Sequence, residues 1–191
     1  MRLKFLPSFV KRKGRITKKQ HMALETLTER YCLESSLPFD SQNCFANSAP
    51  VVLEIGFGMG ESFVEMVRAR PAENFLGIEV HRPGIGHVLA ELDAHQVTNT
   101  RLIEGDAVTW LATCCPENAL SEVLILFPDP WHKKRHHKRR LINEKFVTLL
   151  AKCCRPGALL HLATDWMPYA EEMQSVYNNR FKTKACSLIN D

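Results

Sequence analysis

The sequence contains no apolar run that approaches the roughly 20 residues of a membrane-spanning helix. Its N-terminus, MRLKFLPSFVKRKGRITKKQ, is basic and has no apolar stretch long enough for a signal peptide. These absences argue against a membrane or secreted protein, and we expect a cytoplasmic one. The length of 191 residues suits one domain with a well-buried core.

The seven cysteines lack the spacing of a metal site or a disulfide framework. Their number is odd, no Cys-x-x-Cys occurs, and two pairs are adjacent in the chain, Cys114-Cys115 and Cys153-Cys154. We therefore expect free thiols in a reducing compartment and no bound metal.

Two strongly basic stretches contain no acidic residue. Residues 1–20 hold eight Lys or Arg and residues 131–140 hold six, whereas the remaining 161 residues carry 11 basic and 21 acidic groups. The net charge of +4 is thus the sum of two basic stretches and a remainder of the chain that is acidic. This distribution is typical of a protein that binds nucleic acid.

After Pro50, apolar β-rich runs alternate with helical patterns. Such alternation predicts an α/β fold with a mostly parallel, doubly wound sheet. An N-terminal arm and helix, residues 1–50, would precede a domain at 51–191. The predicted strands are 51–56, 74–80, 100–106, 122–130, 158–165 and 181–189. The predicted helices are 21–34, 62–70, 84–95, 107–113, 142–154 and 168–178.

An acidic residue stands at or near the carboxyl end of five predicted strands. In open parallel sheets, ligands bind beyond the carboxyl ends of the strands, so these acids are candidate site residues. They are Glu54, Glu79, Asp106, Asp129 and Asp165.

The first strand leads into EIGFGMGES, a G-x-G-x-G turn formed by Gly56, Gly58 and Gly60. A dinucleotide-binding turn needs a glycine three residues after the second one, where this chain has Glu61, and an acid there would repel a pyrophosphate. A cofactor without phosphates, such as S-adenosylmethionine, fits better. Glu79 would accept hydrogen bonds from a ribose diol. Asp106 would read an adenine amino group, and Ala107 leaves room for a flat ring.

These residues resemble those of the bacterial tRNA (guanine-N7)-methyltransferase family, which has the Rossmann-like class I methyltransferase fold. The resemblance runs from SFVKRKGRITKKQ through VLEIGFGMGES, GIEVHRPGIG and GDA to LFPDPWHKKRHHKRRL and ATDW. It implies S-adenosyl-L-methionine as cofactor, tRNA as partner and the guanine at tRNA position 46 as target. It also implies cofactor contacts at Glu54, Glu79, Asp106 and Asp129.

The same resemblance implies catalysis at Asp129 and tRNA contacts at Lys133 and Asp165. It further implies a Thr-x-x-Glu segment, a basic tail and a seventh strand after the sixth predicted strand, whereas this sequence stops at Asp191. We therefore expect a C-terminally short chain that lacks some substrate contacts. We expect a monomer or a homodimer, and the sequence does not decide between them.

Methylation at guanine N7 needs no base, because the nitrogen carries an exposed lone pair. The positive charge moves from the sulfonium to the purine, so a fixed carboxylate at Asp129 would align the base and stabilise the growing cation. Pro128 and Pro130 restrict the backbone around it. Trp131 would either stack on a flipped base or pack under the loop.

The cations after Trp131 would bind RNA phosphates, and an N-terminal arm would clamp the tRNA. His132, His136 and His137 are candidates for partial charge near neutral pH, and the surrounding cations argue against a metal there. The loop cations are Lys133, Lys134, Arg135, Lys138, Arg139 and Arg140. The arm cations are Lys11, Arg12, Lys13, Arg15, Lys18 and Lys19.

Three other functions remain open from the residues alone. A nicotinamide oxidoreductase is opposed by the missing third glycine and by the lack of an obvious Tyr-x-x-x-Lys. A non-catalytic RNA-binding protein with a decayed methyltransferase fold is opposed by the intact glycines and acids. A small-molecule methyltransferase would leave the two basic patches without a purpose.

Overall fold

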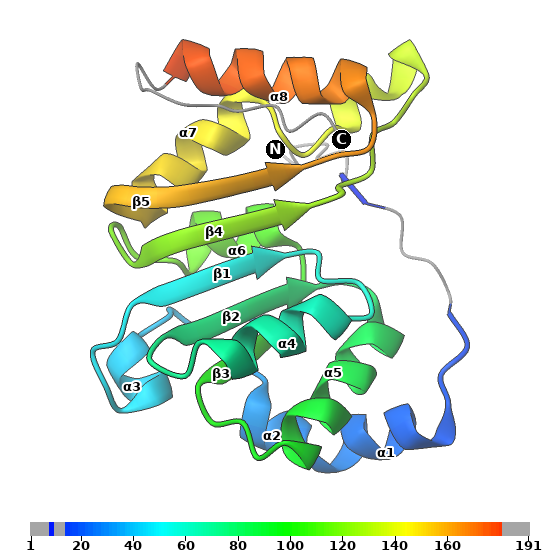
Figure 1. Cartoon of the computed structure of the whole chain (residues 1–191), viewed down its shortest axis with the longest axis vertical. Coiled ribbons are helices and arrows are strands. Elements are labelled where there is room, and N and C mark those ends of the chain that lie inside the picture. Colours follow the sequence, from blue (N-terminus) through cyan, green and yellow to red (C-terminus); the bar gives the residue numbers. More distant parts are fainter. Residues whose placement is uncertain (1–7, 10–13, 181–191) are drawn as a thin grey trace.

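A computed structural model describes residues 8–9 and 14–180 of the chain. Within them, five strands form one parallel sheet in the order β3-β2-β1-β4-β5 (Figure 1). The expected strand at 181–189 lies outside the described residues, as do Lys11, Arg12 and Lys13. The strands are β1 (Val51–Ile55), β2 (Asn74–Glu79), β3 (Thr100–Glu104), β4 (Leu120–Leu126) and β5 (Cys154–Ala163).

Helices cover both faces of the sheet, as expected for a doubly wound fold (Figure 1). Side chains of α1, α4 and α5 pack in one core, and those of α6, α7 and α8 pack in the other. The helices are α1 (Lys18–Thr26), α2 (Thr28–Tyr31), α3 (Ser41–Phe45), α4 (Glu61–Ala69), α5 (Arg82–Ala94), α6 (Ala107–Thr113), α7 (Glu144–Cys153) and α8 (Met167–Arg180), with a 3-10 helix η1 (Lys134–Arg139).

The central strand β1 shows why its sequence is continuously apolar. Val51, Leu53 and Ile55 enter the core under α6 and α7, whereas Val52 enters the core under α4 and α5. A strand buried on both faces gains from apolar residues at every position. Glu54 breaks the run and is nevertheless buried, which apolar packing alone does not explain.

Several predicted boundaries are wrong. The helix expected at 21–34 begins earlier, because Thr17 and Gln20 form a capping box, and it is interrupted at Leu27. Residues 35–50, for which no helix was predicted, contain α3, whose N-cap is Asp40. The strand expected at 158–165 begins earlier, at Cys154, and the pairing register between β4 and β5 shifts near its start.

The residues before Pro50 are packed against the sheet domain. α1 lies along α5, where a Cβ on Gly86 would come within 2.8 Å of the Gln20 carbonyl oxygen. Ala23, Tyr31 and Phe39 are buried in the two cores. This part of the chain therefore helps to fold the domain that it precedes.

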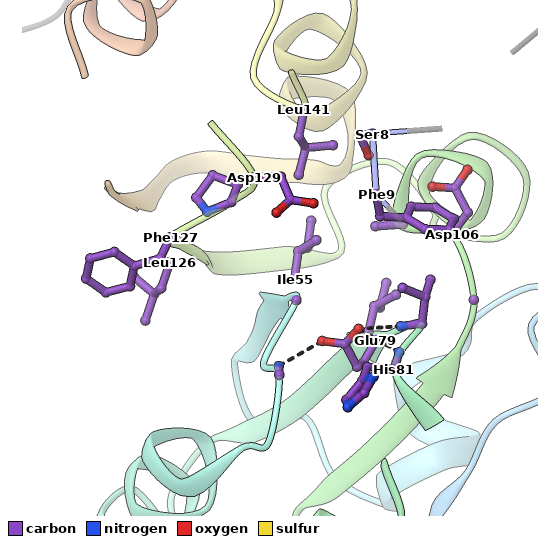
Figure 2. Close-up of a pocket in the computed structure, with 17 residues that line it drawn as sticks. Ser8, Phe9, Ile55, Glu79, His81, Asp106, Leu126, Phe127, Asp129 and Leu141 are labelled. Atoms are coloured by element: carbon purple, nitrogen blue, oxygen red, sulfur yellow. Dashed lines mark hydrogen bonds between the residues drawn. The ribbon is translucent and has the colours of Figure 1, made fainter. Parts of the chain in front are cut away.

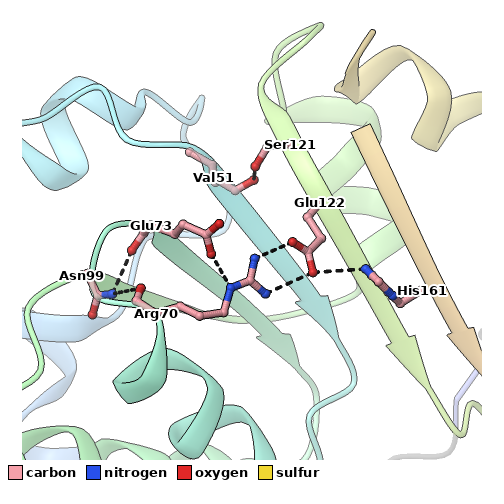
Figure 3. Close-up of polar contacts among 7 residues, drawn as sticks. All are labelled: Val51, Arg70, Glu73, Asn99, Ser121, Glu122 and His161. Carbon is pink, nitrogen blue, oxygen red and sulfur yellow. Dashed lines mark hydrogen bonds and ion pairs between the residues drawn. The ribbon is translucent and has the colours of Figure 1, made fainter. Parts of the chain in front are cut away.

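An ion-pair network joins α4 to the neighbouring strands near the amino end of β4 (Figure 3). The Arg70 guanidinium donates to both carboxylate oxygens of Glu122, at 3.1 and 2.5 Å, and lies 2.5 Å from Glu73. The imidazole of His161 lies 3.2 Å from Glu122. This network ties the sheet together at the end opposite the strand termini discussed below.

No helix in the described part of the chain is long and apolar enough to cross a membrane. The six cysteines that the structure describes are free thiols, as expected.

Candidate functional site

A cavity of about 330 Å³ opens where the carboxyl ends of β1, β2 and β4 meet the residues that follow β3 (Figure 2). Its volume is that of a small-molecule site, and it lies beside the β1–β4 boundary, where the strand order reverses. The residues that line it are Ser8, Phe9, Ile55, Gly56, Gly58, Ile78, Glu79, Val80, His81, Gly105, Asp106, Ala107, Leu126, Phe127, Pro128, Asp129 and Leu141.

Three of the predicted acids come together around this cavity. Figure 2 shows Glu79, Asp106 and Asp129 on different sides of it. Glu54 and Asp165 are not among the lining residues. Asp165 lies exposed between β5 and α8, where the Thr164 hydroxyl accepts from the Trp166 N–H.

The glycines of the turn have two different roles, since two of them border the cavity and one packs against α5. Gly56 and Gly58 line the cavity with positive φ, and a Cβ on either would meet no atom within 4 Å, so bare backbone borders open space there. Gly60 does not line the cavity, and a Cβ on it would lie 2.1 Å from Val88. A Cβ on Gly84 would lie 1.8 Å from the Gly58 carbonyl oxygen. Gly60 and Gly84 thus allow α5 to pack tightly against the turn.

The Glu79 carboxylate organises the turn from the end of β2. It accepts hydrogen bonds from the backbone N–H groups of Gly58 at 2.7 Å, Val80 at 2.6 Å and His81 at 2.8 Å (Figure 2). These bonds join the first two strand ends through one buried carboxylate. A carboxylate can accept about four hydrogen bonds, so Glu79 retains the capacity to accept one from a ligand hydroxyl.

Glu54 lies buried beside the glycine turn with only 3% of its surface exposed, and its Oε2 has no hydrogen-bond partner among the described residues. Burial, followed by the charge of Glu79, raises its pKa to about 7. An unpaired buried carboxyl is costly. Its position beside a cavity therefore favours a ligand that carries positive charge.

Asp106 is the N-cap of α6. Its carboxylate accepts from the N–H groups of Val108 and Thr109 and from the Thr109 hydroxyl. The next residue, Ala107, also lines the cavity. The cap fixes the carboxylate at the rim, and the small side chain of Ala107 leaves space beside it.

Asp129 is exposed at the mouth of the cavity, within a strained backbone segment. Phe127, at φ 52°, and Trp131, at φ 45°, both adopt the left-handed conformation, which bulky residues rarely occupy. The Phe127 N–H donates to the Ala163 carbonyl oxygen at 2.8 Å. Strained segments persist only where surrounding contacts fix them, and they concentrate at functional sites.

Trp131 packs within the loop. Its indole N–H donates to the Ser8 carbonyl oxygen at 3.0 Å, and the Arg139 guanidinium lies 3.9 Å from its ring centroid. Arg139 also donates to the Phe9 carbonyl oxygen at 3.4 Å. Of the two roles expected for Trp131, these contacts match packing.

The basic loop, residues 131–140, is largely exposed. Lys133, Lys134, Arg135 and Lys138 face solvent, whereas Arg139 is half-buried. Arg140 is 3% exposed, so its expected role in binding RNA phosphates is wrong. The pKa of His136 is lowered by partial burial and by neighbouring cations, which reduces the partial charge expected there near neutral pH.

Sequence reasoning missed Ser8, Phe9, His81, Phe127 and Leu141 as lining residues. His81 could have been found, because it lies two residues after the end of β2. Ser8 and Phe9 reach the cavity through contacts with the basic loop, and no local pattern predicts contacts so distant in sequence. In the described residues, no group of three or more His, Cys, Asp or Glu could hold a metal ion.

Comparisons with known proteins agree with this geometry. Residues 48–190 match the model of a family described as "Putative methyltransferase". A tRNA (guanine-N(7)-)-methyltransferase of Methylococcus capsulatus is 51% identical over 90% of this chain and 74% of its own length. One from Francisella tularensis subsp. novicida is 44% identical over 94% of this chain and 80% of its own.

Among solved structures, the precorrin-6y C5,15-methyltransferase of Geobacter metallireducens has a TM-score of 0.54 at 15% identity. It covers 90% of this chain and 76% of its own. At that identity the likeness shows the fold alone, which is the Rossmann-like class I methyltransferase fold. The family model and the extent of identity to the two relatives establish the closer relationship: this chain belongs to the tRNA (guanine-N(7)-)-methyltransferase family.

Proposed function

We propose that this protein transfers a methyl group from S-adenosylmethionine to N7 of a guanine in tRNA, at position 46 of the variable loop. The observation that carries the proposal is the convergence of Glu79, Asp106 and Asp129 on one cavity beside an exposed basic loop. Family membership supports both the reaction and the substrate. The site of action would be the cytoplasm, where tRNA is modified.

The cavity fits the cofactor in size and charge. Gly56 and Gly58 present bare backbone, and the unpaired Glu54 carboxyl lies beside it. In the proposed complex, Glu79 would accept a bond from a ribose hydroxyl, and Asp106 with Ala107 would hold the adenine. Glu54 and Gly60 would act from behind the turn, through charge and through packing.

The cofactor supplies an electrophilic methyl group on a sulfonium. The N7 lone pair forms the new bond, the carbon–sulfur electron pair stays on sulfur, and no proton has to leave N7. Asp129 would accept hydrogen bonds from the guanine N1–H and amino group, and its charge would offset the cation that develops on the purine.

The basic loop would hold the RNA around the cavity. Lys133 and Arg135 are exposed, and neither forms an ion pair with a carboxylate among the described residues, which suits phosphate binding. Arg139 and Asp165 would complete the substrate surface. Arg15, Lys18 and Lys19 of the N-terminal arm would extend it, although Lys19 already pairs with Glu91 at 3.0 Å.

Incubation with labelled S-adenosylmethionine and bulk tRNA, followed by nucleoside analysis, tests this proposal. We expect 7-methylguanosine in tRNA and none in a tRNA whose guanine 46 is replaced. Absence of the modified nucleoside, with cofactor binding intact by calorimetry, would favour a non-catalytic RNA-binding protein. Binding of NAD in place of S-adenosylmethionine would favour an oxidoreductase.

A further inference from the structure

Arg140 differs from every other described cation of the basic loop, because its side chain is only 2% exposed. A guanidinium cannot shed its charge, so burial is tolerated only with partners for its N–H groups. Those partners show what the residue does.

The Arg140 guanidinium connects the start of the basic loop with α8. Its Nε donates to the Pro130 carbonyl oxygen at 2.8 Å, and its Nη1 donates to the Glu172 carboxylate. Its Nη2 lies 3.2 Å from the His137 imidazole, and the group stacks 4.7 Å from the Tyr169 ring centroid.

Helix α8 also holds the far end of the same loop. The Tyr169 hydroxyl, fully buried, accepts the Ile142 N–H at 3.1 Å. Helix α8 therefore holds both ends of the segment from Pro130 to Ile142. Tyr169 binds Ile142 directly, and Glu172 is connected to Pro130 through Arg140.

These contacts lie next to the strained backbone segment from Phe127 to Trp131, which carries Asp129. The bond from Phe127 to Ala163 fixes the side that precedes Asp129. The bond from Arg140 to Pro130 fixes the side that follows it. Without the second bond, the left-handed conformation of Trp131 would lose a contact that holds it.

We propose that Arg140 is a positioning residue that sets the Asp129 carboxylate for methyl transfer, with Glu172 and Tyr169 as its supports. This role rests on the proposed function, since it concerns the same site. Misplacement of a reacting group by about 1 Å costs about a hundredfold in rate. The contribution of Arg140 is therefore to kcat and not to cofactor affinity.

The first test is Arg140→Met, with the exposed Arg155→Met at the amino end of β5 as the matched control. We expect kcat for 7-methylguanosine formation to fall at least about tenfold, with the dissociation constants of S-adenosylmethionine and tRNA within about threefold. Arg155→Met should match the unaltered protein. An unchanged kcat, or a parallel loss of cofactor binding and kcat, would overturn the proposal.

A double-mutant comparison separates positioning from general stability. If Arg140 acts through Asp129, then Asp129→Asn combined with Arg140→Met should be no slower than Asp129→Asn alone. Multiplied losses would overturn the proposal. Should Arg140→Met fail to fold, Glu172→Gln and Tyr169→Phe decide instead, each with an expected loss of about threefold in kcat at constant cofactor affinity.

Amide hydrogen exchange gives a measure that needs no activity. In the cofactor-free protein, Arg140→Met should speed exchange at residues 127–133 while β1 and β2 keep their protection. Unchanged exchange there overturns the proposed positioning. If the unaltered protein forms no 7-methylguanosine in tRNA, the proposed function is refuted. The hydrogen-exchange result would then still show whether Arg140 holds residues 127–133 in place.

Discussion

Asp129 reaches the cavity mouth as an exposed carboxylate, yet the backbone around it is unusually constrained. That combination suits a group that must act on a substrate arriving from solvent. It also allows replacement of the charge without a packing penalty, so its chemistry can be tested cleanly.

We predict that Asp129→Asn lowers kcat by about a hundredfold or more, because the neutral amide no longer offsets the developing cation. The melting temperature and S-adenosylmethionine affinity should change little. Timed 7-methylguanosine assays measure kcat, and calorimetry measures the melting temperature and the affinity for S-adenosylmethionine. The exposed Glu117→Gln is the control. Full activity of Asp129→Asn would contradict the role.

Glu54 gives a prediction about pH. Its folded pKa of about 7 lies above its ordinary value of 4.5, so the folded protein retains a proton that the unfolded chain has lost. Stability from this group therefore falls as the pH rises from about 4.5 through about 7. Glu54→Gln cannot ionise and should be more stable than the unaltered protein at pH 8, by about 1 to 3 kcal/mol.

Urea unfolding at pH 5 and pH 8 measures the effect of Glu54→Gln. The gain should nearly vanish at pH 5, where the folded carboxyl is already protonated. An equal difference at both pH values would mean that the buried carboxyl does not titrate in this window.

Of the five acids expected at strand ends, Glu79, Asp106 and Asp129 line the cavity, because strand ends are visible as changes in residue pattern, whereas Glu54 and Asp165 do not. The sequence could not separate Arg140 from its neighbours, since six cations in ten residues look alike. Burial of Arg140 depends on Glu172 and Tyr169, which lie a helix and a strand further along the chain.

At the scale of elements, α5 packs closely against the glycine turn. We predict that Gly84→Ala destabilises the protein by about 1 to 3 kcal/mol, because its Cβ would lie 1.8 Å from the Gly58 carbonyl oxygen. The displaced turn should also bind S-adenosylmethionine more weakly. Gly105→Ala, whose nearest contact would be an ordinary 3.6 Å, is the matched control for stability by thermal denaturation. Equal melting temperatures would contradict the close approach.

The basic loop is tested by its salt dependence. Lys133→Ala should weaken tRNA binding and reduce the slope of log K against log salt by about 1, because one phosphate contact is lost. Filter binding at several salt concentrations measures this, with the exposed Lys152→Ala on α7 as control. An unchanged slope would show that Lys133 contacts no phosphate.

Element order and type were predictable for β1 to β5 and for α4 to α8, because hydrophobic period and turn residues change together. Boundaries were less so. The capping box at Thr17 and Gln20 extends α1 into a stretch whose charge suggested an arm. Strand β5 begins at Cys154 and so includes Arg155, Pro156 and Gly157, although Pro and Gly usually end such elements.

At the scale of the whole molecule, we expect the ion pairs around Glu122 to contribute to stability but not to activity. Hydrogen bonds from Arg70 lower the pKa of Glu122, so its stabilising contribution is present above the ordinary pKa near 4.5 and is lost as the pH falls further. Glu122→Gln should cost about 1 to 3 kcal/mol at pH 7 and less at pH 4.

Denaturant unfolding at the two pH values measures the Glu122→Gln penalty. Its kcat should equal that of the unaltered protein at a temperature where both are folded, because the network lies at the other end of the sheet. A selective loss of kcat would contradict this separation.

The pairing of β1 with β4 has a consequence for synthesis. Val52 must wait for Glu122 before its strand gains a second neighbour, so a nascent chain that has emerged only as far as β3 carries a half-sheet with a bare hydrogen-bonding edge. Such edges recruit other chains, and distant pairings form slowly. Ribosome-bound intermediates of this protein should therefore depend on chaperones until residue 126 has emerged.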